Sequence, residues 1–212
     1  ATYVKNNIYF LAWKMGDEDS KIMYQFINQA GMVFTDSKPI SPNTALQTAP
    51  RVKRNSLGEV FVNFKDLRDD PIDGDQYFQK IDTAGDPQWG EGVRLDPVDD
   101  IDFSARFTAN TLGGVSVIWE RGTFPDVDIF FQNLTSDGNY SLVEPLAISN
   151  NLGYQFSPIL SGDEQNGMYA IYADQGSGSI DLMVQKLSAN FESEWGETGL
   201  VAMNGLDGDV NY

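Results

Sequence analysis

The sequence predicts an all-β protein, a β-propeller built of four-stranded antiparallel blades, and two observations carry this prediction. A glutamine recurs in four copies, at spacings of 54, 53 and 53 residues. The segment before each glutamine alternates with a period of two, which is typical of a strand with one buried face. Four short strands in a repeat of about 50 residues are the signature of a propeller blade. The repeated glutamines are Gln25, Gln79, Gln132 and Gln185.

Each repeat contains four short extended segments separated by turn residues. The second segment closes on an aromatic residue, whose face we expect to be buried between adjacent blades. The third segment carries the glutamine and is more uniformly apolar, as expected for a strand covered on both sides. Because the glutamine occupies one strand position four times, we expect it to bind backbone groups in a structural role. The closing aromatic residues are Trp13, Phe64, Trp119 and Tyr172.

One segment, residues 21–34, has the composition of a short helix when it is read alone. The same stretch in the other three repeats contains Gly, Pro and Asp, which favour turns. We therefore predict strand, turn and strand here, and very little helix anywhere in the chain.

The repeats also predict how the chain is divided. We expect residues 1–212 to form a single propeller or propeller segment, because a lone blade cannot bury both faces of its sheet. Either four blades close a small ring or the chain is a fragment of a larger propeller, and we favour the fragment. A pair of β-sandwiches is the competing all-β interpretation, and it explains the fourfold register poorly. The predicted blade repeats are 1–49, 50–104, 105–157 and 158–208, with 209–212 starting a further strand.

Composition excludes several classes of function. The chain has 31 acidic and 14 basic residues and a net charge of −17 at pH 7. Such a surface repels phosphate backbones and anionic lipid headgroups, so we expect no nucleic-acid partner and no direct membrane insertion. The chain contains no Cys and no His. Disulfides, Ser-His-Asp triads and zinc sites with His or thiolate ligands are therefore excluded.

Acidic loops are the only candidate metal sites in the sequence. Asp69, Asp70, Asp73 and Asp75 fall within seven residues, beside Gly74. Calcium takes six to eight oxygen ligands, which carboxylates and loop carbonyls usually supply. The spacing does not match an EF-hand, and a solvated turn is the alternative interpretation. We name these four aspartates as candidate calcium ligands and predict no other cofactor.

A longer motif recurs in the second and fourth repeats. It reads Asp-Gln-Tyr-Phe-Gln-Lys-Ile from Asp75 and Asp-Leu-Met-Val-Gln-Lys-Leu from Asp181, followed by Trp-Gly at Trp89 and Trp195. The third repeat keeps the aspartate as Asp128 but lacks the Trp-Gly. These motifs resemble the propeller-like repeats of large secreted and cell-surface proteins of Bacteroidota. The resemblance implies a secreted or cell-surface location and a role in adhesion, display or spacing.

The function predicted from the sequence is a non-enzymatic module for adhesion or rigid display. Its partners would be a protein or glycan ligand and further propeller blades or domains of a longer chain. A carbohydrate-binding, lectin-like propeller is the alternative, with Trp89 and Trp195 as candidate sugar-stacking residues. A glycan-active hydrolase is less favoured, since nothing in the sequence singles out one pair among the 31 acidic residues, and a catalytic pair is defined by its separation in space. No catalytic residue is predicted.

Overall fold

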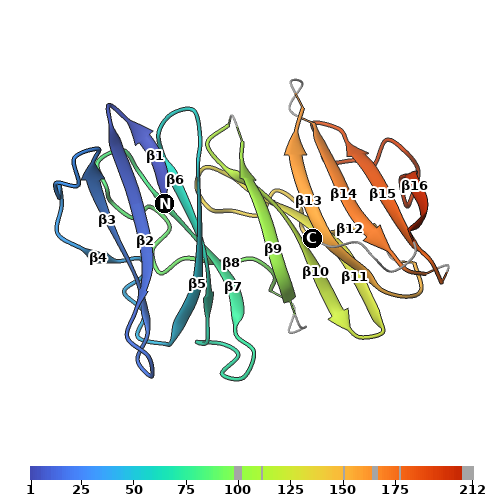
Figure 1. Ribbon diagram of the computed structural model, residues 1–212, viewed down its shortest axis with the longest axis horizontal. Coiled ribbons are helices and arrows are strands. Elements are labelled where there is room, and N and C mark those ends of the chain that lie inside the picture. The colour runs from blue at the N-terminus through green and yellow to red at the C-terminus, as the bar shows by residue number, and fades with distance from the viewer. Residues whose placement is uncertain (98–101, 111, 150, 164–166, 177, 207–212) are drawn as a thin grey trace. The chain divides into compact units, whose positions relative to one another are not determined.

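The computed structural model describes residues 1–97, 102–110, 112–149, 151–163, 167–176 and 178–206. Among these residues the chain forms sixteen β-strands and no helix (Figure 1). The strands make four sheets, each with four antiparallel strands in sequence order. The prediction of an all-β fold of four-stranded antiparallel propeller blades is confirmed. Residues 21–34 contain β3 and a turn, so the prediction of strand rather than helix is also correct.

We number the sheets blades 1 to 4 along the chain. Blade 1 comprises β1 (Thr2–Lys5), β2 (Ile8–Met15), β3 (Lys21–Asn28) and β4 (Lys38–Pro39). Blade 2 comprises β5 (Gln47–Arg54), β6 (Val60–Asp66), β7 (Asp75–Ile81) and β8 (Val93–Arg94). Blade 3 comprises β9 (Asp102–Ala109), β10 (Val115–Thr123), β11 (Asp126–Leu134) and β12 (Leu146–Ser149). Blade 4 comprises β13 (Gln155–Gly162), β14 (Met168–Asp174), β15 (Ile180–Leu187) and β16 (Leu200–Leu206).

The chain divides into two compact units. The first contains blades 1 and 2 together with two short segments, Thr111–Gly114 and Thr135–Asn139. The second contains the strands of blades 3 and 4. The limits of the blade repeats and the single-domain assignment made from the sequence stay predictions.

The core of the first unit lies between blades 1 and 2. Alternation along β2 and β6 turns one face of each strand toward the other blade, where Phe10 meets Val60, Val62 and Phe64. All four side chains are fully buried. The opposite face of β2 carries Trp13, which is only partly buried, unlike the closing aromatic residues of the other blades. The expectation of uniform burial therefore fails at Trp13, because no second blade of this unit covers that face.

The core of the second unit lies between blades 3 and 4. Ile118 and Phe131 of blade 3 pack with Ala170 and Tyr172 of blade 4, and none of the four is exposed. Burying a large apolar side chain stabilises a fold by roughly 1.5–3 kcal/mol. Each unit therefore has its own apolar interior, as expected for blades that cannot bury both faces alone.

The repeated glutamines connect the third strand of each blade to the segment that follows it. In every blade the side-chain amide donates to a backbone carbonyl, at distances of 2.8 to 3.0 Å. In blades 2 to 4 the side-chain carbonyl also accepts from two backbone N–H groups. Both ends of a buried amide are thereby satisfied. The accepting carbonyls are those of Thr35, Gly90, Leu142 and Gly196.

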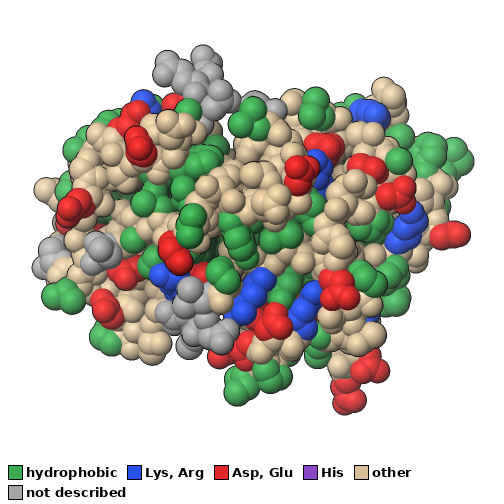
Figure 2. Space-filling model, turned by 180° about the vertical axis from the view of Figure 1, so that it is seen from behind, with side chains coloured by type: hydrophobic (Ala, Val, Ile, Leu, Met, Phe, Trp, Pro, Cys, Tyr) green, Lys and Arg blue, Asp and Glu red, His purple; other side chains and the backbone are tan. Residues whose placement is uncertain are grey.

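The surface carries the strong negative charge expected from the composition. Figure 2 shows Asp and Glu side chains spread over the visible face, with few Lys and Arg among them. Within the described ranges, no helix has the length and apolar character that crossing a bilayer requires.

Candidate functional site

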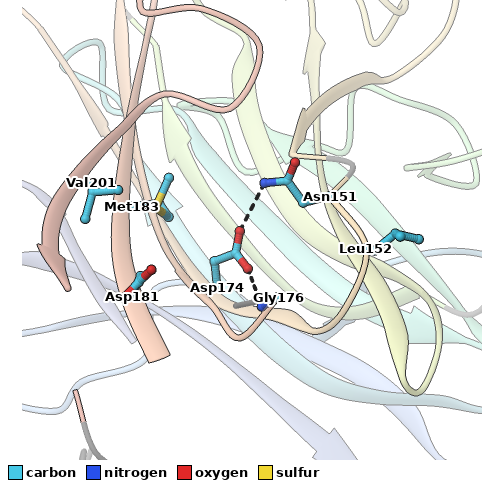
Figure 3. A pocket seen from close by; sticks show the side chains of 7 residues that line it. All are labelled: Asn151, Leu152, Asp174, Gly176, Asp181, Met183 and Val201. Carbon is cyan, nitrogen blue, oxygen red and sulfur yellow. Dashed lines mark hydrogen bonds between the residues drawn. The ribbon is translucent and has the colours of Figure 1, made fainter. Parts of the chain in front are cut away.

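A pocket of about 340 Å³ opens in the second unit, beside the paired strands β14 and β15. Two carboxylates line it together with one amide and three apolar side chains, and no Lys or Arg is among the lining residues (Figure 3). Pockets that combine apolar walls with a few polar groups are the usual sites of small-molecule binding. The lining residues are Asn151, Leu152, Asp174, Gly176, Asp181, Met183 and Val201.

Asp174 is the most firmly held carboxylate of the pocket. It ends β14 and is 8% exposed. One carboxylate oxygen accepts from the backbone N–H of Gly176 at 2.7 Å and from Nε2 of the buried Gln155 at 3.4 Å. The other oxygen accepts from Nδ2 of Asn151 at 3.2 Å (Figure 3). Three donors therefore orient this side chain at the wall of the pocket.

Asp181 faces Asp174 across the sheet. It lies near the start of β15, directly opposite Asp174 in the antiparallel register. Its Oδ1 accepts from the backbone N–H of Gly205 at 3.0 Å. Directly opposed side chains on neighbouring strands have Cβ atoms about 4.5–5.5 Å apart, and like charges at such positions repel. The pocket therefore gathers negative charge on one short stretch of the sheet.

A third carboxylate, Asp128, lies on β11, opposite Arg121 of β10. Burial raises its pKa to about 6, and repulsion by Asp126 and Asp174 adds to this effect, while Arg121 opposes it. Oδ1 of Asp128 is buried and has no hydrogen-bond partner among the described residues. Asp128 is therefore a half-buried carboxyl group whose pKa lies above the ordinary value of an aspartate.

Two aromatic residues come soon after the pocket-lining Leu152 in the sequence, and a third lies in the turn between β10 and β11. Tyr154 stacks on Phe156 at 4.7 Å between ring centroids, and Phe124 meets Tyr154 edge to face at 5.8 Å. Phe124 is 74% exposed, and the pocket-lining Leu152 is 85% exposed. Backbone hydrogen bonds hold this segment beside the hairpin, since Val127 N–H donates to Gly153. We call Phe124, Tyr154 and Phe156 the aromatic ladder.

The structure places the predicted calcium ligands in separate interactions. Asp69 accepts from the hydroxyl of Tyr77, and Asp75 forms an ion pair with Arg94 at 2.9 Å. Asp70 accepts from the backbone N–H groups of Ile72 and Asp73, which lowers its pKa. Within the part of the chain that the structure describes, no three acidic side chains are grouped as metal ligands. Calcium binding at this loop stays a prediction.

Sequence reasoning did not find the pocket. Asp128 and Asp181 were recognised only as members of the repeat motif, and Asp174 and Asn151 were not singled out. One signal was available: an aspartate stands two residues after the closing aromatic in the second and fourth repeats, at Asp66 and Asp174. The candidate sugar-stacking Trp89 is 6% exposed and Trp195 is partly buried.

No protein-family model and no curated protein matches this chain. Solved structures match it at low identity. An ulvan lyase, bound to a saccharide of GlcA and Rha3S, is 9% identical over 90% of this chain and 56% of its own, with a TM-score of 0.50. An endo-arabinase from Bacteroides thetaiotaomicron is 14% identical over 86% of this chain and 72% of its own, with a TM-score of 0.44. A thermostable family-43 glycoside hydrolase is 10% identical over 91% and 70%, with a TM-score of 0.47.

These structures correct the function predicted from the sequence. The ulvan lyase, with a TM-score of 0.50, is a glycan-active enzyme by its name, which contradicts the prediction of a non-enzymatic module for adhesion or display. The reason for the error is that the prediction rested on a resemblance of repeats, and a fold does not specify an activity. At these identities the likeness establishes the propeller fold, and the chain spans 56% of the ulvan lyase.

Proposed function

We propose that this chain is a glycan-active enzyme that hydrolyses a glycosidic bond at the pocket of blade 4. The observation that carries the proposal is the pocket-lining Asp174, which three donors orient, together with Asp128, whose pKa of about 6 is raised in part by the charge of Asp174. Glycoside hydrolysis needs two carboxyl groups in different protonation states. The ulvan lyase, whose fold is similar, is a glycan-active enzyme by its name, and this supports a glycan as the substrate.

In the proposed reaction Asp128 is the acid. As the glycosidic C–O bond breaks, its carboxyl group transfers a proton to the leaving oxygen. The Asp174 carboxylate takes a proton from a water molecule, whose oxygen bonds to the anomeric carbon. Asp181 adds negative charge that stabilises the positive character of the sugar in the transition state. Proton exchange with solvent then returns both carboxyl groups to their starting states.

The surroundings of the pocket favour a neutral glycan over an anionic one. Among the described residues that line the pocket there is no Lys or Arg to bind a carboxylate or sulfate group of a sugar, and the aspartates there repel such groups. The aromatic ladder offers exposed ring surface on which the apolar face of a sugar can pack, as exposed apolar patches often do at binding grooves. An extended neutral polysaccharide fits both features. We also propose a secreted or cell-surface location, and the repeat-module resemblance is part of this proposal.

The experiment is a reducing-end assay of the purified chain on neutral polysaccharides, arabinan included, and on an anionic one such as ulvan. We expect release from a neutral substrate, with a rate that falls above pH 6 as Asp128 loses its proton. Asp128→Asn and Asp174→Asn should each lower the rate by about 10²–10⁴-fold. The matched control is Asp70→Asn, a partly exposed carboxylate in the first unit. A chain that cleaves no neutral polysaccharide, or variants as active as the control, would overturn the proposal.

A further inference from the structure

A buried glutamine holds one of the carboxylates that line the pocket of blade 4. Gln155 begins β13 and is fully buried. It stands directly opposite Asp174 in the register of β13 and β14, and its Nε2 donates to Oδ1 of that carboxylate at 3.4 Å. Its Oε1 is also buried and has no hydrogen-bond partner among the described residues. One end of this side chain therefore holds Asp174, while the other end is an acceptor without a donor.

Backbone pairing brings Asp128 next to this glutamine. Val127 of β11 and Tyr154, the residue before β13, form a parallel bridge. Because the two segments run in the same direction, the residues that follow, Asp128 and Gln155, are neighbours where blades 3 and 4 meet. The charge of Asp174 also acts on Asp128. The glutamine and the two carboxyl groups therefore form one group of side chains.

The equivalent glutamine of blade 2 shows the direction in which Oε1 of Gln155 is aimed. Gln47 stands at the same repeat position, and its Nε2 donates to Asp66 at 2.9 Å. Its Oε1 accepts from the backbone N–H of Ile22, on the third strand of blade 1, at 3.2 Å. The counterpart of Ile22 in blade 3 directly follows Asp128 near the start of β11. By this correspondence Oε1 of Gln155 faces the stretch of β11 that carries Asp128.

Asp128 provides a second buried acceptor without a donor. Its Oδ1 is buried and has no hydrogen-bond partner in the described part of the chain. The groups that act on its charge are Asp126 on β11, Arg121 on β10 and Asp174 on β14. The guanidinium group of Arg121 lies over the ring of Phe130, 3.4 Å from its centroid. Two acceptors repel one another unless one of them carries a proton, and burial together with the two aspartates favours the neutral form of Asp128.

We propose that Gln155 is a positioning residue that joins the two carboxyl groups of the proposed reaction. The neutral carboxyl group of Asp128 donates its O–H to Oε1 of Gln155, while Nε2 of Gln155 donates to the carboxylate of Asp174. The amide thereby keeps the proton on Asp128 and the charge on Asp174, since each of its ends bonds to one form only. A glycosidic oxygen that enters the pocket competes with Oε1 for the proton. The role in catalysis rests on the proposed function, whereas the hydrogen bond itself does not.

The hydrogen bond is tested by NMR titration of the full chain between pH 4 and pH 8, without substrate. We expect the side-chain amide of Gln155 to titrate with the midpoint of Asp128, at about pH 6, because its carbonyl loses a donor as that carboxyl group ionises. Asp128→Asn should abolish this change. The amide of Gln47, whose donor is a backbone N–H, is the internal control and should not follow the same midpoint. A Gln155 amide that stays unchanged from pH 4 to pH 8 overturns the proposal.

The variant Gln155→Met removes the acceptor and keeps the length of the side chain. An acceptor stabilises the neutral form of Asp128, so its loss should lower the midpoint of that carboxyl group by about 0.5–1 unit. Gln47→Met removes the equivalent buried amide of blade 2 and should leave this midpoint unchanged, which separates the contact from a general loss of stability. Equal midpoints for the parent and Gln155→Met overturn the proposal. A midpoint that depends on calcium overturns it as well, because a cation then occupies the place of the proton.

Kinetics test the role in catalysis separately. On a glycan that the chain hydrolyses, Gln155→Met should move the fall of rate with rising pH to lower pH, by the same amount as the NMR midpoint, and Gln47→Met should not. A pH–rate profile that stays in place while the NMR midpoint moves overturns the positioning role. If the chain hydrolyses no glycan, the proposed function fails, and the titration still decides whether the amide joins the two carboxyl groups.

Discussion

Blades 2 and 4 carry a pair of aspartates at the same repeat positions. In blade 2 both aspartates pair with arginines, and in blade 4 they line a pocket. Asp66 and Asp75 oppose one another across β6 and β7, as Asp174 and Asp181 do across β14 and β15. In blade 2 each aspartate has an arginine, with Arg68 at 2.7 Å from Asp66 and Arg94 at 2.9 Å from Asp75. In blade 4 the positions of both arginines are occupied by residues that line the pocket. These are Gly176 and Val201.

The correspondence of these positions follows from the strand register. Arg68 and Gly176 both stand two residues after the first aspartate of their blade. Arg94 pairs with Tyr77 on the third strand, and Val201 pairs with Met183, which is the repeat counterpart of Tyr77. Blade 2 therefore differs from blade 4 at two positions that matter for charge. Arginines there pair with the aspartates in blade 2, whereas a glycine and a valine line an acidic pocket in blade 4.

The structure around Gly176 leaves no room for an arginine at this position. A Cβ atom at Gly176 would lie 2.6 Å from the carbonyl oxygen of Leu152 and 3.0 Å from Oδ1 of Asp174. Any larger residue must push the Leu152 segment away from the pocket. Buried glutamines hold the first aspartate in both blades, Gln47 at 2.9 Å from Asp66 and Gln155 at 3.4 Å from Asp174. Blade 4 thus has the same glutamine contact as blade 2 but has no arginine at the positions of Arg68 and Arg94.

The largest expected effect comes from removing a cation from blade 2. Arg94→Leu leaves the carboxylate of Asp75 without its ion pair, and that side chain is 6% exposed. Breaking a buried pair at one partner costs about 3–5 kcal/mol, because a charge stays buried without compensation. The free energy of unfolding, measured by urea denaturation at pH 7, should fall by this amount.

Two variants control this measurement. Lys14→Leu removes an exposed cation 4.0 Å from Asp17 and should change the unfolding free energy by less than about 0.5 kcal/mol. Replacing Asp75 and Arg94 together by Leu should recover most of the loss, because no buried charge then remains. A loss below about 1 kcal/mol for Arg94→Leu would mean that the Asp75 carboxylate is already compensated by other groups.

The second effect comes from giving blade 4 the arginine that it lacks. Val201→Arg places a cation beside the aspartate pair, at a residue that is 53% exposed, so the fold should tolerate it. The guanidinium group should pair with Asp181 as Arg94 pairs with Asp75, filling the pocket and neutralising its charge. We expect the rate of glycan hydrolysis to fall by about 10²-fold or more. Val201→Leu is the matched control, and equal rates for the two variants would show that the pocket is not the site of reaction.

A smaller effect concerns Asp128, which shares the repeat position of Asp75 and Asp181. Burial and the charges of Asp126 and Asp174 outweigh the attraction of Arg121 and raise the pKa of Asp128 to about 6. Since its pKa is higher in the folded state, the group favours folding at low pH. That contribution is complete below about pH 4 and is lost as the pH rises to 6.

Asp128→Asn should therefore remove part of the decline in stability between pH 4 and pH 6. We expect a difference of about 1 kcal/mol between the two curves at pH 7, because water screens a half-buried group. Urea unfolding at a series of pH values measures both curves. Parallel curves for the parent and the variant would show that Asp128 titrates normally.

The sequence was sufficient to predict the blades because their signals are local and repeated. Period-two alternation and the glutamine spacing need no knowledge of what packs against a strand. The pocket is different, because it depends on which side chains meet from separate strands. Asn151, Asp174 and Val201 come from three separate segments of two repeats, and the absence of an arginine at Val201 is visible only through the pairing of β15 with β16. The partial burial of Trp13 was not predicted for a similar reason, since the sequence around Trp13 does not show which side chains cover it.

The smallest expected effect is that of calcium on the loop of Asp69, Asp70, Asp73 and Asp75. Binding a ligand to the folded state alone contributes about 2.7 kcal/mol at a hundredfold excess over Kd. Here the gain should be smaller, because Asp69 and Asp75 would have to leave Tyr77 and Arg94 to bind the ion. The sequence-based prediction is a melting temperature that rises slightly in millimolar calcium.

The comparison between the two blades decides how the calcium result is interpreted. The double variant Asp70→Asn, Asp73→Asn should abolish the rise if the loop binds the ion, whereas Asp181→Asn should leave it unchanged. If instead only Asp181→Asn abolishes the rise, the cation binds the aspartate pair of blade 4, because the described residues that line this pocket include no arginine to compete for the carboxylates. Equal melting temperatures in calcium and in chelator would contradict both. In that case the loop of blade 2 is a solvated turn held by Asp70, which accepts from the N–H groups of Ile72 and Asp73 without any ion.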